Sequence, residues 1–226
     1  MTEITGAVVL VVGASGVLGS EIARRLEAEG ATVVRAGRNP EHLSGSDIFL
    51  ADLTDDAAAS AIVAVALGRH DRLDGVVIAA GVVAFGPASE VTDDTLEQLF
   101  AINALGPIRL IREATKYLAA SASGGRAPFI VTMSGIVAES PTAGLAAYSA
   151  SKAALAAFVK ASSRELRRSG IRMLDARPGH TETGLATRAI AGIAPAFPPG
   201  LEPAAVAARI VRGILDDEKD LPSSAF

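Results

Sequence analysis

The chain alternates short, unbroken apolar runs with longer stretches of helical periodicity. An apolar run of four to six residues that is rich in Val, Ile and Ala predicts a buried strand. Six runs fit this description, and we expect strands at Ala7–Val12, Thr32–Ala36, Ile48–Ala51, Val76–Ala80, Phe129–Thr132 and Arg172–Ala176.

Helical spacing of apolar residues fills most of the segments between and after these runs. Strands that are apolar throughout and are separated by helices indicate a parallel sheet with helices on both faces. The predicted helices are Val17–Glu29, Asp55–Leu67, Thr95–Ala120, Ala150–Ser169 and Pro203–Asp217.

The remaining segments favour a single domain over residues 1–226. Ser121–Pro128 is the most linker-like stretch, but it lies only a few residues from a helix and a strand, so we interpret it as a surface loop. Gly184–Pro203 has no regular periodicity, and we predict a substrate loop over 184–203 because long loops in compact domains often bind ligands. The tail Glu218–Phe226 is too polar to predict a strand.

Composition excludes several classes of function. The 226 residues include no cysteine, which excludes disulfides, thiolate metal sites and cysteine nucleophiles. The 21 basic and 25 acidic residues give a net charge of −4, which argues against a nucleic-acid or polybasic membrane binder. The three histidines share no metal-ligand spacing, and no targeting segment precedes the first strand. We therefore expect no metal and a cytoplasmic protein.

A glycine-rich turn follows the first predicted strand and opens the first predicted helix. It reads Gly13-Ala14-Ser15-Gly16-Val17-Leu18-Gly19. In such turns the first glycine permits the tight turn, the second lets the backbone approach a pyrophosphate, and the third lets the helix pack closely on the strand. The turn lacks the Gly-Lys-Ser/Thr ending of a nucleoside-triphosphate loop. We predict a dinucleotide site contacted by Gly13, Ser15, Gly16, Val17 and Leu18, on a Rossmann-type doubly wound sheet.

The end of the second predicted strand favours NADP(H) over NAD(H). Sites for NAD place an acidic residue there to bind the ribose 2′-hydroxyl. The segment Thr32–Pro40 has no acid; Gly37 stands at the expected position and Arg38 follows it. A guanidinium suits a 2′-phosphate. The alternative is an exposed surface arginine, and Arg35 is a second candidate for the phosphate.

Tyr148 and Lys152 are four residues apart in Tyr148-Ser149-Ala150-Ser151-Lys152, so both side chains lie on one helix face. A phenol with an ordinary pKa near 10 is a poor acid–base catalyst at neutral pH, and an adjacent ammonium lowers that pKa. In isolation, a tyrosine and a lysine at this spacing are usually surface residues without a shared function.

With these residues in view, the chain resembles the short-chain dehydrogenase/reductase family, in its compact single-domain branch. The resemblance runs from the glycine turn to about Leu215 and centres on the Tyr-x-x-x-Lys motif. It implies that Tyr148 exchanges a proton with a carbonyl or alcohol oxygen while hydride moves at the nicotinamide. It also implies that Lys152 lowers the tyrosine pKa and binds the nicotinamide ribose.

The same resemblance implies roles for other residues. Asn103 matches the asparagine that holds a proton-relay water in the family. Asp52, with Leu53 beside it, resembles the adenine-contacting aspartate, although a plain helix cap is the alternative. The remaining cofactor contacts that the resemblance implies are Ala80, Gly81, Pro178, Gly179, Thr181 and Thr183.

The sequence departs from the family pattern at three places. The glycines have the G-x-x-G-x-x-G spacing of the extended branch, and Ile78-Ala79-Ala80-Gly81 replaces the usual Asn-Asn-Ala-Gly. The catalytic serine usually precedes the tyrosine by 13 residues, a position that Gly135 occupies here. We expect Ser134 to supply this hydroxyl through a loop one residue longer, with Ser140 as the fallback.

The expected function is NADP(H)-dependent interconversion of a carbonyl and a secondary alcohol, on a small nonpolar substrate, in a homodimer or homotetramer. One alternative is a dinucleotide-binding sensor or scaffold with little catalysis. Another is a nucleotide-sugar epimerase or dehydratase, but only 43 residues (226 minus 183) follow Thr183, which is short for the substrate domain of those enzymes.

Overall fold

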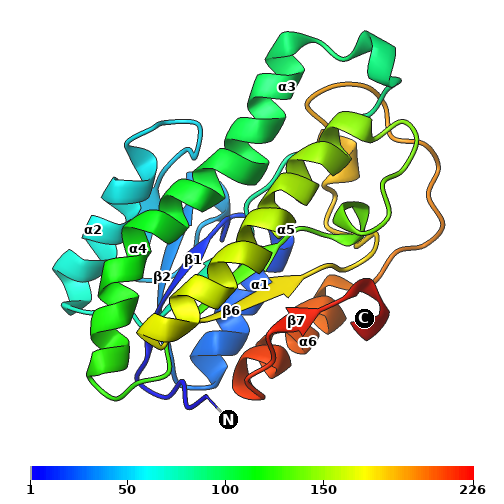
Figure 1. Ribbon diagram of the computed structural model, residues 1–226. Coiled ribbons are helices and arrows are strands. Elements are labelled where there is room, and N and C mark those ends of the chain that lie inside the picture. The colour runs from blue at the N-terminus through cyan, green and yellow to red at the C-terminus, as the bar shows by residue number, and fades with distance from the viewer. Residues whose placement is uncertain (1) are drawn as a thin grey trace.

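The computed structural model describes residues 2–226 and is built on one seven-stranded sheet (Figure 1). The strand order is β3-β2-β1-β4-β5-β6-β7, and every neighbouring pair is parallel. The predicted parallel sheet is therefore confirmed, with the strand order of a Rossmann-type fold. The strands are β1 (Val8–Val12), β2 (Thr32–Gly37), β3 (Ile48–Leu50), β4 (Gly75–Ile78), β5 (Phe129–Met133), β6 (Arg172–Ala176) and β7 (Asp220–Leu221).

Helices cover both faces of the sheet, as the apolar strands require. Helices α1 (Val17–Ala28) and α6 (Pro203–Leu215) pack on one face, and α2 (Ala58–His70), α4 (Gly106–Ser123) and α5 (Ala146–Leu166) pack on the other. Alternate residues of β1 enter the two cores because successive side chains of a strand point to opposite faces. Val9 and Val11 contact the first layer, whereas Val8, Leu10 and Val12 contact the second.

The single helix predicted over Thr95–Ala120 is interrupted. The structure has α3 (Asp93–Phe100), one π-helical turn over Ala101–Leu105, and then α4. Pro107 has no backbone N–H, so the carbonyl of Asn103 loses its α-helical partner, and the N–H of Gly106 donates to the more distant carbonyl of Ala101. The interruption places Asn103 beside the carboxyl end of β4.

The tail contains a strand, contrary to the prediction. The two residues of β7 extend the sheet beyond β6, and Leu221 is fully buried. The backbone N–H of Arg177 donates to Leu221, and the Arg177 guanidinium binds the Asp220 carboxylate. The tail is mostly polar, so its sequence did not predict a strand. The strand forms because its backbone pairs with β6.

Candidate active site

The glycine turn lies at the carboxyl end of β1, against the end of β4. Gly13 has a φ of +86°, and a Cβ there would come within 2.5 Å of the Ala80 backbone nitrogen. A Cβ at Gly19 would come within 2.3 Å of the Gly13 carbonyl oxygen. Gly16 begins α1 without a side-chain cap, so the N–H groups of the first helical turn remain available to an anion.

A cavity of about 1000 Å³ extends from this turn to the ends of β2 and β3. Its size and elongated lining fit a dinucleotide. At its far end Arg38 lies 3.6 Å from the Asp52 carboxylate, and both side chains are exposed. The cavity brings together nine residues that the sequence predicted for the cofactor: Gly13, Ser15, Gly16, Val17, Arg38, Asp52, Leu53, Ala80 and Gly81.

A second cavity of about 340 Å³ adjoins the first along Gly16, Val17 and Gly81. Its inner wall carries both the tyrosine and the lysine of the predicted pair. The predicted residues that line it are Gly16, Val17, Leu18, Ala80, Gly81, Tyr148, Lys152, Pro178, Gly179, Thr181 and Thr183.

The Tyr–Lys pair is held in a desolvated environment. Burial lowers the pKa of Lys152 to about 8, while the nearby charge of Asp175 acts to raise it. The Lys152 ammonium donates to the Met133 carbonyl oxygen at 2.8 Å. Burial raises the pKa of Tyr148 to about 12, which is opposite to the lowering expected from the ammonium. Desolvation is the cause of this shift, so Tyr148 is a neutral phenol at physiological pH.

Asn103 lies beside this pair but lines neither cavity. It is fully buried; its amide oxygen accepts from the Val82 N–H, and its amide nitrogen donates to the Val82 carbonyl and to Ser151. A Cβ on Gly81 would come within 3.2 Å of both the Asn103 amide oxygen and the Lys152 nitrogen. The Asn103 side chain thus fixes the end of β4 against α5.

The structure does not bring the Ser134 hydroxyl into the cavity with Tyr148. Ser134 is fully buried and donates to Asp175 at 2.5 Å. Thr132, two residues earlier and on the same face of the strand, donates to the same carboxylate at 2.7 Å. A buried carboxylate needs such donors, and it holds the Ser134 hydroxyl in the buried layer between the sheet and α5 rather than in the cavity. The fallback, Ser140, is exposed and lines neither cavity.

Several residues that line the cavities were not predicted from the sequence. Asn39, His42 and Ser44 line the first cavity near Arg38. In the sequence, only their closeness to Arg38 indicated that they could contact a cofactor. The second cavity adds Phe85, Thr142 and His180 from separate segments, and the predicted substrate loop 184–203 contributes Arg188 and Phe197. Gly135, at the position where the family carries serine, lines it too.

The described residues, 2–226, contain no group of three or more His, Asp or Glu that could hold a metal ion. Within the same range, no helix has both the length and the apolar character needed to cross a membrane.

The fold and the cavities define a Rossmann-type protein with a dinucleotide cradle next to a Tyr–Lys pair. The family model of the short chain dehydrogenases matches residues 7–193, and the chain belongs to this family. The resemblance drawn from the sequence is thereby confirmed.

Individual relatives have different activities. A 2,3-dihydro-2,3-dihydroxybenzoate dehydrogenase from Bacillus subtilis is 32% identical over 80% of this chain and 72% of its own length. A cyclic-di-GMP-binding biofilm dispersal mediator protein from Escherichia coli is 33% identical over 81% and 76%. The structure of a 3-ketoacyl-(acyl-carrier-protein) reductase from Brucella melitensis, complexed with NADH, superposes with a TM-score of 0.85 at 22% identity and covers 98% of this chain and 99% of its own.

Proposed function

We propose that this protein is an NADP(H)-dependent oxidoreductase that interconverts a carbonyl and a secondary alcohol. The observation that carries the proposal is the presence of Tyr148 and Lys152 in a cavity that opens directly onto the dinucleotide-sized cavity. The glycine turn and Lys152 would hold NADP(H), whose nicotinamide would supply or accept the hydride. The protein supplies the orientation and the proton.

Tyr148 is the acid in the direction of reduction. Hydride adds to the carbonyl carbon, and the phenol of Tyr148 gives its proton to the carbonyl oxygen, so a secondary alcohol forms. Because the pKa of Tyr148 is raised to about 12, the phenol is protonated and ready to donate at neutral pH. Lys152, held by the Met133 carbonyl, keeps a positive charge near the phenolate that results.

The test is a titration with NADPH and NADH, followed by turnover of a carbonyl panel with the tighter-binding cofactor. Net oxidation of the reduced cofactor with formation of an alcohol supports the proposal. Cofactor binding with no turnover of any carbonyl contradicts it. Substrate conversion without net cofactor oxidation favours an epimerase or dehydratase instead.

Arg38 is the basis of the NADPH preference. We expect Arg38→Ala to weaken NADPH binding by about 10- to 100-fold, the range for losing a charged hydrogen bond, and to leave NADH binding nearly unchanged. Calorimetric titration of both cofactors measures this. Arg24→Ala is the control, since Arg24 is an exposed arginine on α1 that pairs with Glu21 and lines neither cavity. Equal losses for both cofactors would contradict the assignment, and the NADH in the Brucella structure makes this test necessary.

A dinucleotide-binding sensor is the second candidate. It is favoured by the burial of Ser134 and by Gly135 at the position where the family carries its catalytic serine. The E. coli relative is likewise named as a binding protein. The carbonyl panel separates the two candidates, because only the enzyme couples binding to alcohol formation.

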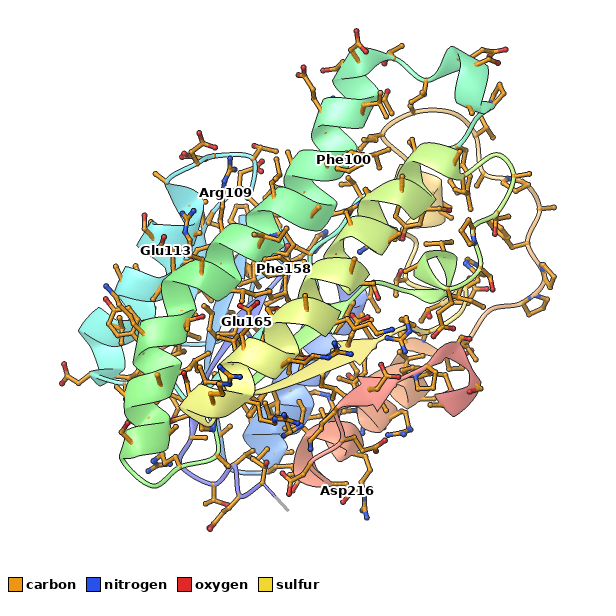
Figure 2. All side chains as sticks on the ribbon, in the orientation of Figure 1. Phe100, Arg109, Glu113, Phe158, Glu165 and Asp216 are labelled. Atoms are coloured by element: carbon orange, nitrogen blue, oxygen red, sulfur yellow. The ribbon has the colours of Figure 1, made fainter. Side chains whose placement is uncertain are left out.

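We propose a homodimer or homotetramer that forms through α4 and α5. The two helices pack against each other, and Figure 2 shows Glu113, Phe158 and Glu165 on the side of this layer that faces the viewer. Light scattering coupled to size exclusion measures the mass of the assembly. A monomer at micromolar concentration would contradict this part of the proposal.

A further inference from the structure

The segment 190–201, which we call the strap, is fixed to the protein at both ends. At one end, the Ile190 N–H donates to Val83 and the Phe85 N–H donates to Ala191. At the other end, Leu201 exchanges backbone hydrogen bonds with His180 and Glu182. The strap is therefore a preformed wall of the second cavity rather than a free loop.

The strap places one aromatic ring, Phe197, against two others. The Phe197 ring stacks on His180 with 4.7 Å between centroids and a 29° interplanar angle. It lies 6.0 Å from the Phe85 ring at a tilt of 48°. All three side chains line the second cavity, together with Tyr148. They come from three separate segments and form one aromatic wall.

The position of His180 is set by its neighbours. Its ring nitrogen Nε2 lies 3.4 Å from a carboxylate oxygen of Glu182, and the same oxygen accepts from the Gly200 N–H at 2.7 Å. A Cβ at Gly200 would come within 2.7 Å of the His180 ring. The Glu182 carboxylate thus contacts both the strap and the imidazole, and Gly200 packs closely against the His180 ring.

The charges around the second cavity argue against a cationic ligand. None of the described residues that line it is Asp or Glu, so nothing there would pair with a cationic group. Arg188 donates to the Thr183 carbonyl and lines both cavities. The Lys152 ammonium is bound to Met133. The wall opposite these cations is apolar and includes Val137 and Leu145.

We propose that the second cavity accepts a single-ring aryl ketone or aryl aldehyde without a cationic group, with the ring against Phe197 and His180 and the carbonyl toward Tyr148. This inference rests on the proposed function and names its substrate class. The cavity, at about 340 Å³, is near the small end of ligand sites and also carries residues predicted to hold the nicotinamide, so the space beside the aromatic wall fits one ring rather than a fused or long-chain substrate. An aromatic ring gains offset-stacking and edge contacts here that a saturated ring of similar area lacks.

The experiment compares acetophenone with cyclohexyl methyl ketone, which differ in the aromaticity of the ring. With the wild-type protein we expect kcat/KM to favour acetophenone by about five- to tenfold, the effect of one or two aromatic contacts. Phe197→Leu keeps an apolar wall and removes the ring, so the ratio of the two kcat/KM values should fall toward one. Ile193→Ala is the control, because Ile193 lies in the strap, is 92% exposed and does not line the cavity.

A binding measurement separates this inference from the proposed function. Acetanilide and N-cyclohexylacetamide, two amides that a nicotinamide does not reduce, are titrated into protein saturated with NADPH. Tighter binding of acetanilide that is lost in Phe197→Leu supports the aryl site even if no ketone is turned over. Ketone turnover without any aryl preference, or a preference unchanged by Phe197→Leu, overturns the aryl site and leaves the proposed function standing.

Discussion

Replacing Tyr148 with Phe should lower turnover by about 10²- to 10⁴-fold, the usual contribution of a positioned acid or base. The change removes one hydroxyl from a ring that otherwise keeps its place between Val83 and Leu145, so folding and cofactor affinity should remain close to wild type. The measurement is the single-turnover rate of carbonyl reduction, with NADPH binding determined on the same sample.

Tyr117→Phe is the matched control for this prediction. Tyr117 is the other tyrosine of the chain; it lies on α4 and lines neither cavity. Its variant should keep full turnover. A Tyr148→Phe protein with wild-type turnover would remove Tyr148 from the mechanism while leaving the family assignment intact.

Asp175→Asn should lower the free energy of unfolding by about 3–5 kcal/mol, as expected when one partner of a buried ion pair is removed. The Asp175 carboxylate accepts from Thr132, Ser134 and the Arg177 guanidinium, the last at 2.9 Å. An asparagine has one oxygen instead of two and carries no charge. Urea unfolding of the variant and the wild type near neutral pH measures the loss.

The same variant should change how stability depends on pH. The Lys152 pKa is lowered from 10.5 to about 8 in the folded protein, and the Asp175 charge prevents a larger shift. A lysine with a lowered folded pKa binds fewer protons than the unfolded chain, so its burial costs most below the folded pKa and nothing above the unfolded one. Without Asp175 the folded pKa falls further, so the stability deficit of the variant should be larger near pH 7 than near pH 10.

Asp74→Asn is the control for the pH effect. Asp74 is also buried and bound by several donors, among them Ser121 and the Val8 N–H. Burial acts to raise its pKa, but these hydrogen bonds and Arg72 hold the pKa below its usual value. The Asp74→Asn variant should be destabilised by a similar amount at both pH values. A deficit in Asp175→Asn that stays constant over this interval would show that Asp175 does not act on Lys152.

Local sequence determined the parts of the site that depend on neighbours in the chain. The strand, glycine turn and helix from Val8 to Ala28 formed as predicted. Gly13 and Gly19 make this turn possible, because a Cβ at either position would clash with nearby backbone atoms. Tyr148 and Lys152 share a cavity because a spacing of four residues on a helix puts them on one face.

Tertiary structure decided the features whose causes lie far apart in the chain. Ser134 turned away from the cavity because Asp175, 41 residues later, is buried beside it and needs donors. The one signal available in the sequence was an acid among the apolar residues that follow Arg172 in β6. The tail became a strand because β6 offered it a free edge, although its own residues are mostly polar.

The sequence by itself therefore determined the family, the alternation of strands and helices, the glycine turn and the Tyr–Lys pair. Each of these depends on backbone conformation and on spacings of a few residues. Only the tertiary structure decided which hydroxyls face the site, that burial rather than Lys152 governs the pKa of Tyr148, and that Phe85, His180 and Phe197 form one wall. Those outcomes depend on desolvation and on contacts between segments that are distant in sequence, which no local pattern encodes.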